Sequence, residues 1–186
     1  MDIINHAVTL ISIIVGIGLT EMFGNLHRLI RNRAQVSWDW LPVLWSGSLL
    51  MLVINYWWAI YQGIIGLDQL SNAAELGLIL IQPILLFLLA ASVLPSFGAA
   101  QTCDMRRYYE DSRRTFLGTF VLYQILNYAI AFIIGTLGWN VPTGIRTIIL
   151  LLLVLALLIN NRRFDWVAAA GILAVLILRL TTQLTR

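Results

Sequence analysis

Six long runs of apolar residues, separated by shorter polar segments, form the dominant pattern along the chain. They cover residues 4–27, 41–61, 73–94, 115–136, 143–159 and 166–182. Each run is close to the ~20 residues that a helix needs to cross the hydrocarbon core of a bilayer. The pattern therefore predicts an all-α integral membrane protein, with a single six-helix transmembrane domain over residues 1–186.

The polar segments between the runs contain residues that commonly begin helices. Pro42 suits the first turn of the second helix, and Asp165 is expected to cap the sixth. The longest polar segment, residues 96–114, is expected to be a cytoplasmic loop. Its second part, residues 104–114, places acidic and arginine residues at helical spacing. This part is predicted to form a helix that continues into the fourth run.

The distribution of arginine predicts the orientation in the membrane. The segments after the first, third and fifth runs hold Arg28, Arg31, Arg33, Arg106, Arg107, Arg113, Arg114, Arg162 and Arg163. Because basic residues concentrate in cytoplasmic loops, we expect three cytoplasmic loops and both termini outside the inner membrane of a bacterial cell. Arg146, Arg179 and Arg186 lie near the outer ends, where we expect their side chains to extend to the interface.

Two of the arginine-bearing turns resemble each other. Residues 32–40 and 161–166 each hold arginine followed by an aspartate–tryptophan pair. Either the similarity marks a weak repeat of helical hairpins, or a cytoplasmic turn simply favours arginine, a capping residue and an interfacial tryptophan.

The first run carries small residues at four-residue spacing, which we call the small-residue ladder. The ladder consists of Ser12, Gly16, Thr20 and Gly24. Small residues at this spacing let two membrane helices approach closely. We expect the ladder to pack either within the subunit or against a second copy or a partner membrane subunit.

A polar stripe runs beside the ladder and contains Glu21, Asn25 and Arg28. A carboxylate at membrane depth costs roughly 2.5–3.5 kcal/mol on insertion scales, so we expect Glu21 to face the bundle and the first helix to be central. Two interpretations of Glu21 remain open. It is either a structural acid paired with a neighbour or a titratable, ion-coordinating group.

The other runs contain few polar residues. Those in the second, third and fourth runs are Asn55, Gln82, Tyr123, Gln124, Asn127 and Tyr128. They predict a polar interior formed mainly by the first, second and fourth helices. The alternative is hydrogen-bonded packing of the amides, worth about 0.6 kcal/mol for each bond.

Composition narrows the range of functions. Charged residues make up 11% of the 186 residues, against about 25% in soluble domains, and 60% are hydrophobic. The net charge of +3 comes from arginines beside helix ends, so no nucleic-acid partner is expected. The single cysteine, Cys103, excludes an internal disulfide. We expect no metal, no cofactor and no catalytic residues, because no nucleotide-binding, zinc-binding or nucleophile motif is found.

Two hypotheses of different classes follow. In the first, the protein is a pathway or carrier for protons, small ions or a small solute, lined by Glu21, Asn25, Arg28, Asn55, Gln124 and Asn127. In the second, it is a non-catalytic membrane subunit or sensor that binds partner helices through the ladder. Its contacts with lipid headgroups or a cytoplasmic partner would be made by Arg106, Arg107, Arg113 and Arg114. In both, the bilayer and a second copy or a partner subunit are the expected partners.

Overall fold

The computed structural model describes residues 2–62, 73–96, 102–133, 135, 138 and 141–184. Within these residues the chain is almost entirely helical. The long helices are α1 (Asp2–Arg31), α2 (Trp40–Tyr61), α3 (Ala73–Ser92), α4 (Met105–Ile133), α5 (Val141–Ile159) and α6 (Arg162–Leu184). A short helix and two strands complete the described structure: η1 (Arg33–Gln35), β1 (Val36–Ser37) and β2 (Cys103–Asp104).

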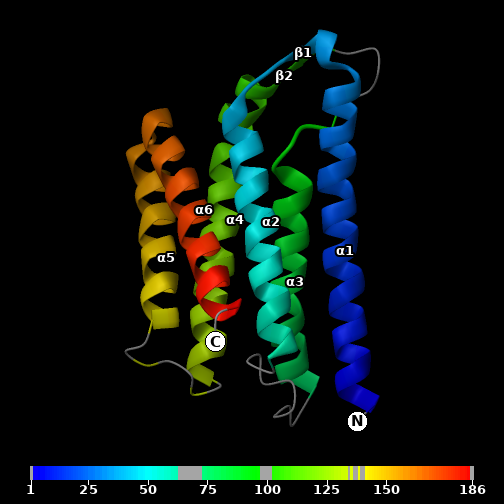
Figure 1. Cartoon of the computed structure of the whole chain (residues 1–186), viewed down its shortest axis with the longest axis vertical. Coiled ribbons are helices and arrows are strands. Elements are labelled where there is room, and N and C mark those ends of the chain that lie inside the picture. Colours follow the sequence, from blue (N-terminus) through cyan, green and yellow to red (C-terminus); the bar gives the residue numbers. More distant parts are fainter. Residues whose placement is uncertain are drawn as a thin grey trace.

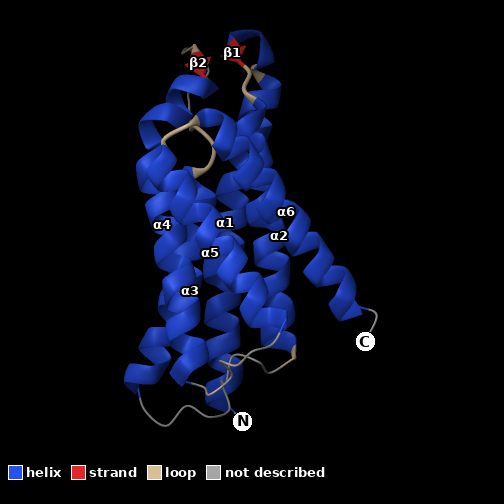
Figure 2. Cartoon of the chain, turned by 90° about the vertical axis from the view of Figure 1, so that its left-hand side faces the viewer, coloured by secondary structure: helices blue, strands red, loops and turns tan. Residues whose placement is uncertain are grey.

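The helices alternate in direction along one elongated bundle, with α1 at one edge and the α5–α6 pair at the other (Figure 1). α1 begins and α6 ends toward the same end, which we call the terminal end. The opposite end holds the two strands and the α5–α6 turn, and we call it the arginine-rich end (Figures 1 and 2). There Val36 pairs with Cys103 and Ser37 with Asp104 in a parallel register, so the α1–α2 turn lies against the start of α4.

The described helices have the apolar character of a membrane protein. Four are long and apolar enough to cross a membrane: Asn5–Arg31, Trp40–Tyr61, Met105–Ile133 and Arg162–Thr182. The apolar parts described for α3 and α5, Ile79–Ser92 and Thr143–Ile159, are shorter. An all-helical, membrane-type chain is thus confirmed. The helix predicted for residues 104–114 is present as the first turns of α4.

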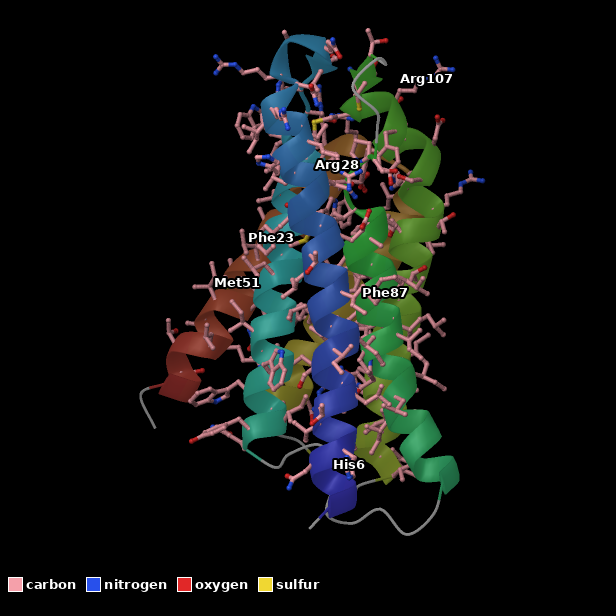
Figure 3. All side chains as sticks on the ribbon, turned by 90° about the vertical axis from the view of Figure 1, so that its right-hand side faces the viewer. His6, Phe23, Arg28, Met51, Phe87 and Arg107 are labelled. Carbon is pink, nitrogen blue, oxygen red and sulfur yellow. The ribbon has the colours of Figure 1, made fainter. Side chains whose placement is uncertain are left out.

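α1 packs chiefly on α3 and lies at the edge of the bundle (Figures 1 and 3). The expectation that the first helix is central is therefore wrong. The close contact is made by Gly18, where a Cβ atom would lie 3.0 Å from the Cα of Phe87 and 3.5 Å from the Cβ of Ala90. The ladder does not make it, since no atom lies within 4 Å of a Cβ built on Gly16, and Thr20 is exposed.

α2 is tied to α6 by two side-chain hydrogen bonds. Ser48 Oγ donates to the carbonyl of Ala169 and Asn55 Nδ2 to that of Leu176, each over 3.2 Å. Donors and acceptors are both seven residues apart, so the two helices keep the same register over two turns. These bonds place buried polar groups of α2 against backbone carbonyls of α6.

An aromatic cluster joins α2 to α4. The fully buried Trp45 ring packs edge-on against Phe116 and Phe120, with centroids 5.4 and 6.1 Å apart. Its indole N–H donates to the Tyr109 hydroxyl over 3.2 Å. Such edge-to-face contacts add about 0.5–1.5 kcal/mol to the energy of burial. The cluster fills the bundle on its arginine-rich side.

A buried ion pair connects α4 to α6 at this end. Arg113 donates from Nε to Asp165 Oδ2 over 2.6 Å and from Nη2 to Oδ1 over 2.9 Å, and its Nη1 donates to Asn160 Oδ1. Asp165 is fully buried and Arg113 is 6% exposed. The expectation that Asp165 caps the sixth helix is wrong, because α6 begins at Arg162 and Asn161 Oδ1 accepts from the backbone N–H of Arg163.

A second chain of charges lies beside this pair. Asp39 caps α2 by accepting from the N–H of Leu41 over 3.1 Å, and its other oxygen accepts from Arg162. Arg162 also lies 3.6 Å from Glu110, which accepts from Arg106 over 2.9 Å. The segment before α2, the first turns of α4 and the start of α6 are therefore held together at the arginine-rich end.

Removing the Arg113 guanidinium should destabilise the bundle. Arg113→Gln leaves Asp165 buried without a counter-charge, so we expect the free energy of unfolding to fall by roughly 3–5 kcal/mol. The matched control is Arg114→Gln, which alters the exposed neighbouring arginine and should have little effect. Chemical unfolding of both variants in detergent micelles measures the difference. Equal stabilities would show that the pair is not a structural element.

Candidate functional site

A polar cavity of about 60 Å³ lies among α2, α3, α4, α5 and α6. This volume corresponds to about two water molecules at ~30 Å³ each. The polar residues of its lining are Asn55, Tyr56, Gln82, Tyr123, Gln124, Asn127, Arg146 and Arg179. The remaining lining residues are apolar, among them Leu52, Ile130, Ile149 and Leu176. No residue of α1 contributes to the described lining.

α2 supplies two lining residues with unused hydrogen-bonding capacity. Asn55 donates through Nδ2 to the carbonyls of Met51 and Leu176, which leaves its buried Oδ1 without a partner among the described residues. The hydroxyl of the neighbouring Tyr56 is likewise buried and without a hydrogen bond there. Buried polar groups are nearly always satisfied by protein or by ordered water. These two atoms therefore indicate a hydrated or ligand-occupied space.

α3 and α4 form the next part of the wall. Gln82 precedes Pro83, whose ring removes a backbone donor inside α3 and leaves the carbonyl of Ile79 without its helical partner. On α4, Tyr123, Gln124 and Asn127 follow at spacings that place them on one side of the helix. Gln82, Tyr123 and Gln124 are each at most 3% exposed, so these polar side chains lie within the bundle and not on its surface.

α5 and α6 each contribute one arginine to the cavity. Arg146 lies 13 residues before the end of α5, and Arg179 lies 17 residues after the start of α6. Because the two helices are antiparallel, this places the arginines within about 6 Å of the same level. Both side chains line the cavity and are partly exposed, with buried Nε atoms that lack a partner among the described residues. Their extension to the interface stays a prediction.

The cavity carries positive charge without a described counter-charge. The ion pairs within the described residues involve other arginines. The carboxylates with described side chains lie on α1 or at the arginine-rich end, and they are Glu21, Asp39, Asp104, Glu110, Asp111 and Asp165. Both arginines lie five residues from a helix end, Arg146 from the start of α5 and Arg179 from the end of α6, and both are partly exposed. Water or an anion can therefore reach the two guanidinium groups and compensate their charge.

The structure divides the predicted pathway residues into two groups. Asn55, Gln124 and Asn127 lie together at the cavity, whereas Glu21 and Arg28 lie on α1. The Glu21 side chain is 45% exposed, with Oε1 3.9 Å from Arg28 Nη2. The expectation that Glu21 faces the bundle interior is therefore wrong for the single chain.

The third predicted residue on α1, Asn25, differs from its neighbours in the stripe. It is 1% exposed, and neither its Oδ1 nor its Nδ2 has a hydrogen-bond partner among the described residues. Asn25 thus belongs to the buried side of α1, whereas the side chains of Glu21 and of Arg28, which Figure 3 labels, are about half exposed.

The four arginines assigned to a partner or to lipid headgroups also separate. Arg106 is exposed and pairs with Glu110, and Arg107 and Arg114 are exposed as well. Arg113 is instead buried against Asp165. Three of the four thus present charge at the surface of the arginine-rich end.

Sequence reasoning missed the role of Arg146 and Arg179 in the cavity. The signal was present, because each is a single basic residue within an otherwise apolar run and both lie on the same helical hairpin. Two basic residues at matched levels of an antiparallel hairpin come close together, whether or not they also lie near an interface. Sequence reasoning noted each arginine separately and missed that Arg146 and Arg179 form a pair at the cavity.

The cavity should be accessible to water. In a Cys103→Ser background, which removes the only native thiol, we expect Asn127→Cys to react readily with a hydrophilic thiol reagent, because the reactive thiolate forms only in a hydrated site. The matched control is Leu117→Cys, on the same helix at a fully buried position away from the cavity. Labelling rates measured by mass spectrometry should differ by about tenfold or more. Equal protection of both thiols would contradict a hydrated cavity.

The groups lining the cavity are suited to binding a polar solute, because amides, phenols and guanidinium groups donate and accept hydrogen bonds without forming covalent bonds. Among the described residues no group of three or more histidine, cysteine, aspartate or glutamate side chains could hold a metal ion. No protein-family model, curated protein or solved structure matches this chain.

Proposed function

We propose that this chain is a six-span protein of a bacterial inner membrane, with both termini outside, that admits a small solute or ion to the polar cavity. The observation that supports the proposal is the cavity itself, a cluster of polar side chains among five helices of an otherwise apolar bundle. Polar and ionisable groups inside a membrane bundle generally mark a substrate or ion pathway.

The unused hydrogen-bonding groups favour a pathway over simple packing. If the amides served only to join helices, their polar atoms would be saturated by neighbouring residues. Asn55 Oδ1 and the Tyr56 hydroxyl are buried and have no partner among the described residues. A solute or its water can provide the missing partners.

The cavity is closed by packed side chains toward the arginine-rich end and is less covered by helices toward the terminal end. Toward the arginine-rich end, Trp45, Phe116 and Phe120 fill the bundle, and the Arg113–Asp165 pair lies beyond them. Toward the terminal end, α6 leans away from the other helices (Figure 2). In this proposal the solute enters from the terminal end, and passage to the other side requires the aromatic cluster to move.

Solute uptake into proteoliposomes tests the proposal. We expect wild-type protein to admit at least one of potassium, protons, glycerol or acetate. Asn127→Leu and Gln124→Leu should each slow uptake by about tenfold, since a lost hydrogen bond to a desolvated solute is worth roughly 1.4 kcal/mol. Glu21→Gln is the comparison variant, because Glu21 lies outside the cavity. Liposomes that remain impermeable to every probe would refute the pathway.

A second candidate function rests on a separate observation on α1. Gly16 and Thr20 are exposed, and the neighbouring Glu21 and Arg28 side chains are 45% and 49% exposed. Charged groups facing lipid are costly, and exposed small residues at this spacing suit a close helix–helix contact. In this alternative the protein is a membrane subunit, and α1 binds a second copy or a partner helix.

Two glycine variants distinguish the proposed contact between α1 and a partner helix from the contact between α1 and α3 inside the subunit. Gly16→Leu should abolish association without unfolding the subunit, because no atom lies within 4 Å of its Cβ position. Gly18→Leu should destabilise the subunit itself by about 1–3 kcal/mol through collision with the backbone of Phe87. Native mass spectrometry from lipid nanodiscs reports association. The alternative fails if Gly16→Leu leaves the mass of the assembly unchanged.

A further inference from the structure

We infer that the cavity binds a small anion, whose carboxylate or phosphate oxygens lie between Arg146 and Arg179. This inference rests on the proposed function, because it names the chemical class of the solute that the cavity admits. The two side chains come from different helices, α5 and α6, and line the same cavity.

Charge is the first reason. Both guanidinium groups are positive at any physiological pH, and the cavity lining contains no carboxylate. Two like charges in a partly desolvated site repel each other, so a cation would add to the repulsion and an anion would relieve it. Rings of arginine or lysine are correspondingly used by pores that select anions or phosphate.

Hydrogen-bonding geometry is the second reason. The Nε atoms of Arg146 and Arg179 are buried and without partners among the described residues, and so is the hydroxyl of Tyr56. A guanidinium group presents parallel N–H donors that match the two oxygens of a carboxylate or phosphate. The described site thus offers donors from three helices to one oxyanion, while Asn55 Oδ1 remains an acceptor for a protonated oxygen or a water.

Size is the third reason. The cavity of about 60 Å³, about the volume of two water molecules, fits the oxygen-bearing end of a small anion whose remaining atoms extend toward the terminal end. A phosphate group could come from free phosphate or from a lipid headgroup. The chemistry at the two arginines is the same for both sources.

Anion binding to the full chain in phosphatidylcholine nanodiscs tests the inference. Isothermal titration with sodium acetate and sodium phosphate should detect binding to wild type, and Arg146→Gln and Arg179→Gln should each weaken it by about tenfold or more. Arg146→Lys and Arg179→Lys, which keep the charge, should recover part of the affinity. The control is Arg163→Gln, at an exposed position on the arginine-rich end. Circular dichroism checks that each variant is folded.

Two further arms identify the source of the anion. If nanodiscs containing phosphatidylglycerol suppress the binding of free acetate and phosphate, the lipid phosphate group occupies the site. Asp68 and Glu75 lie outside the residues whose side chains are described. If wild type binds no anion but Asp68→Asn/Glu75→Gln does, the chain's own carboxylates neutralise the arginines and the inference is overturned.

The outcomes distinguish this inference from the pathway proposal. Arginine-dependent anion binding without any solute uptake would support the anion site and refute the pathway. Uptake of glycerol or potassium with no detectable anion binding would support the pathway and overturn the inference. Equal affinities in wild type and both glutamine variants would also overturn it.

Discussion

The structure depends on one constraint, which is that buried polar groups in a membrane-type bundle must find partners inside the chain. The Arg113–Asp165 pair meets it most completely, because the carboxylate receives two hydrogen bonds and the guanidinium donates to a third group, Asn160. Asn55 meets it in part, through the carbonyl of Leu176 on α6. Several groups at the cavity do not meet it among the described residues, and neither does Asn25 on α1. The need of buried polar groups for partners thus explains the contacts between helices, and it also supports the proposed binding of a solute in the cavity.

Arginines that are buried or partly buried have different surroundings at the two ends of the bundle. At the arginine-rich end, Arg113 and Arg162 are paired with the carboxylates of Asp165 and Asp39, and those charges hold turns together. In the cavity, Arg146 and Arg179 have no such acids among the described residues. An arginine that is paired within the chain contributes to stability, and one that is left unpaired is available to a solute. The contrast between the two pairs is the main argument that the cavity has a binding role.

Much of the fold was predictable from the apolar runs, because helix length in a bilayer is set by its thickness. The placement of α1 was not, because the argument from Glu21 assumed that every charged group is covered within one chain. The cavity amides on α2 and α4 were predicted from their polarity alone. Arg146 and Arg179 were not, since their importance depends on the packing of α5 against α6, and local sequence carries no information about which helices become neighbours. The aspartates of the two similar turns, residues 32–40 and 161–166, lie at the same end of the bundle. Asp39 and Asp165 each accept a hydrogen bond from an arginine there.

The hydrogen bonds between α2 and α6 also impose an order on biogenesis. Ser48 and Asn55 are each separated from their acceptors by 121 residues, so nearly the whole chain must be synthesised before these acceptors exist. During that interval the two side chains can donate only to the backbone of α2, as they do to Leu44 and Met51. The contacts between the second helix and the last are therefore completed only at the end of synthesis, and a chain truncated before α6 would lack both of them.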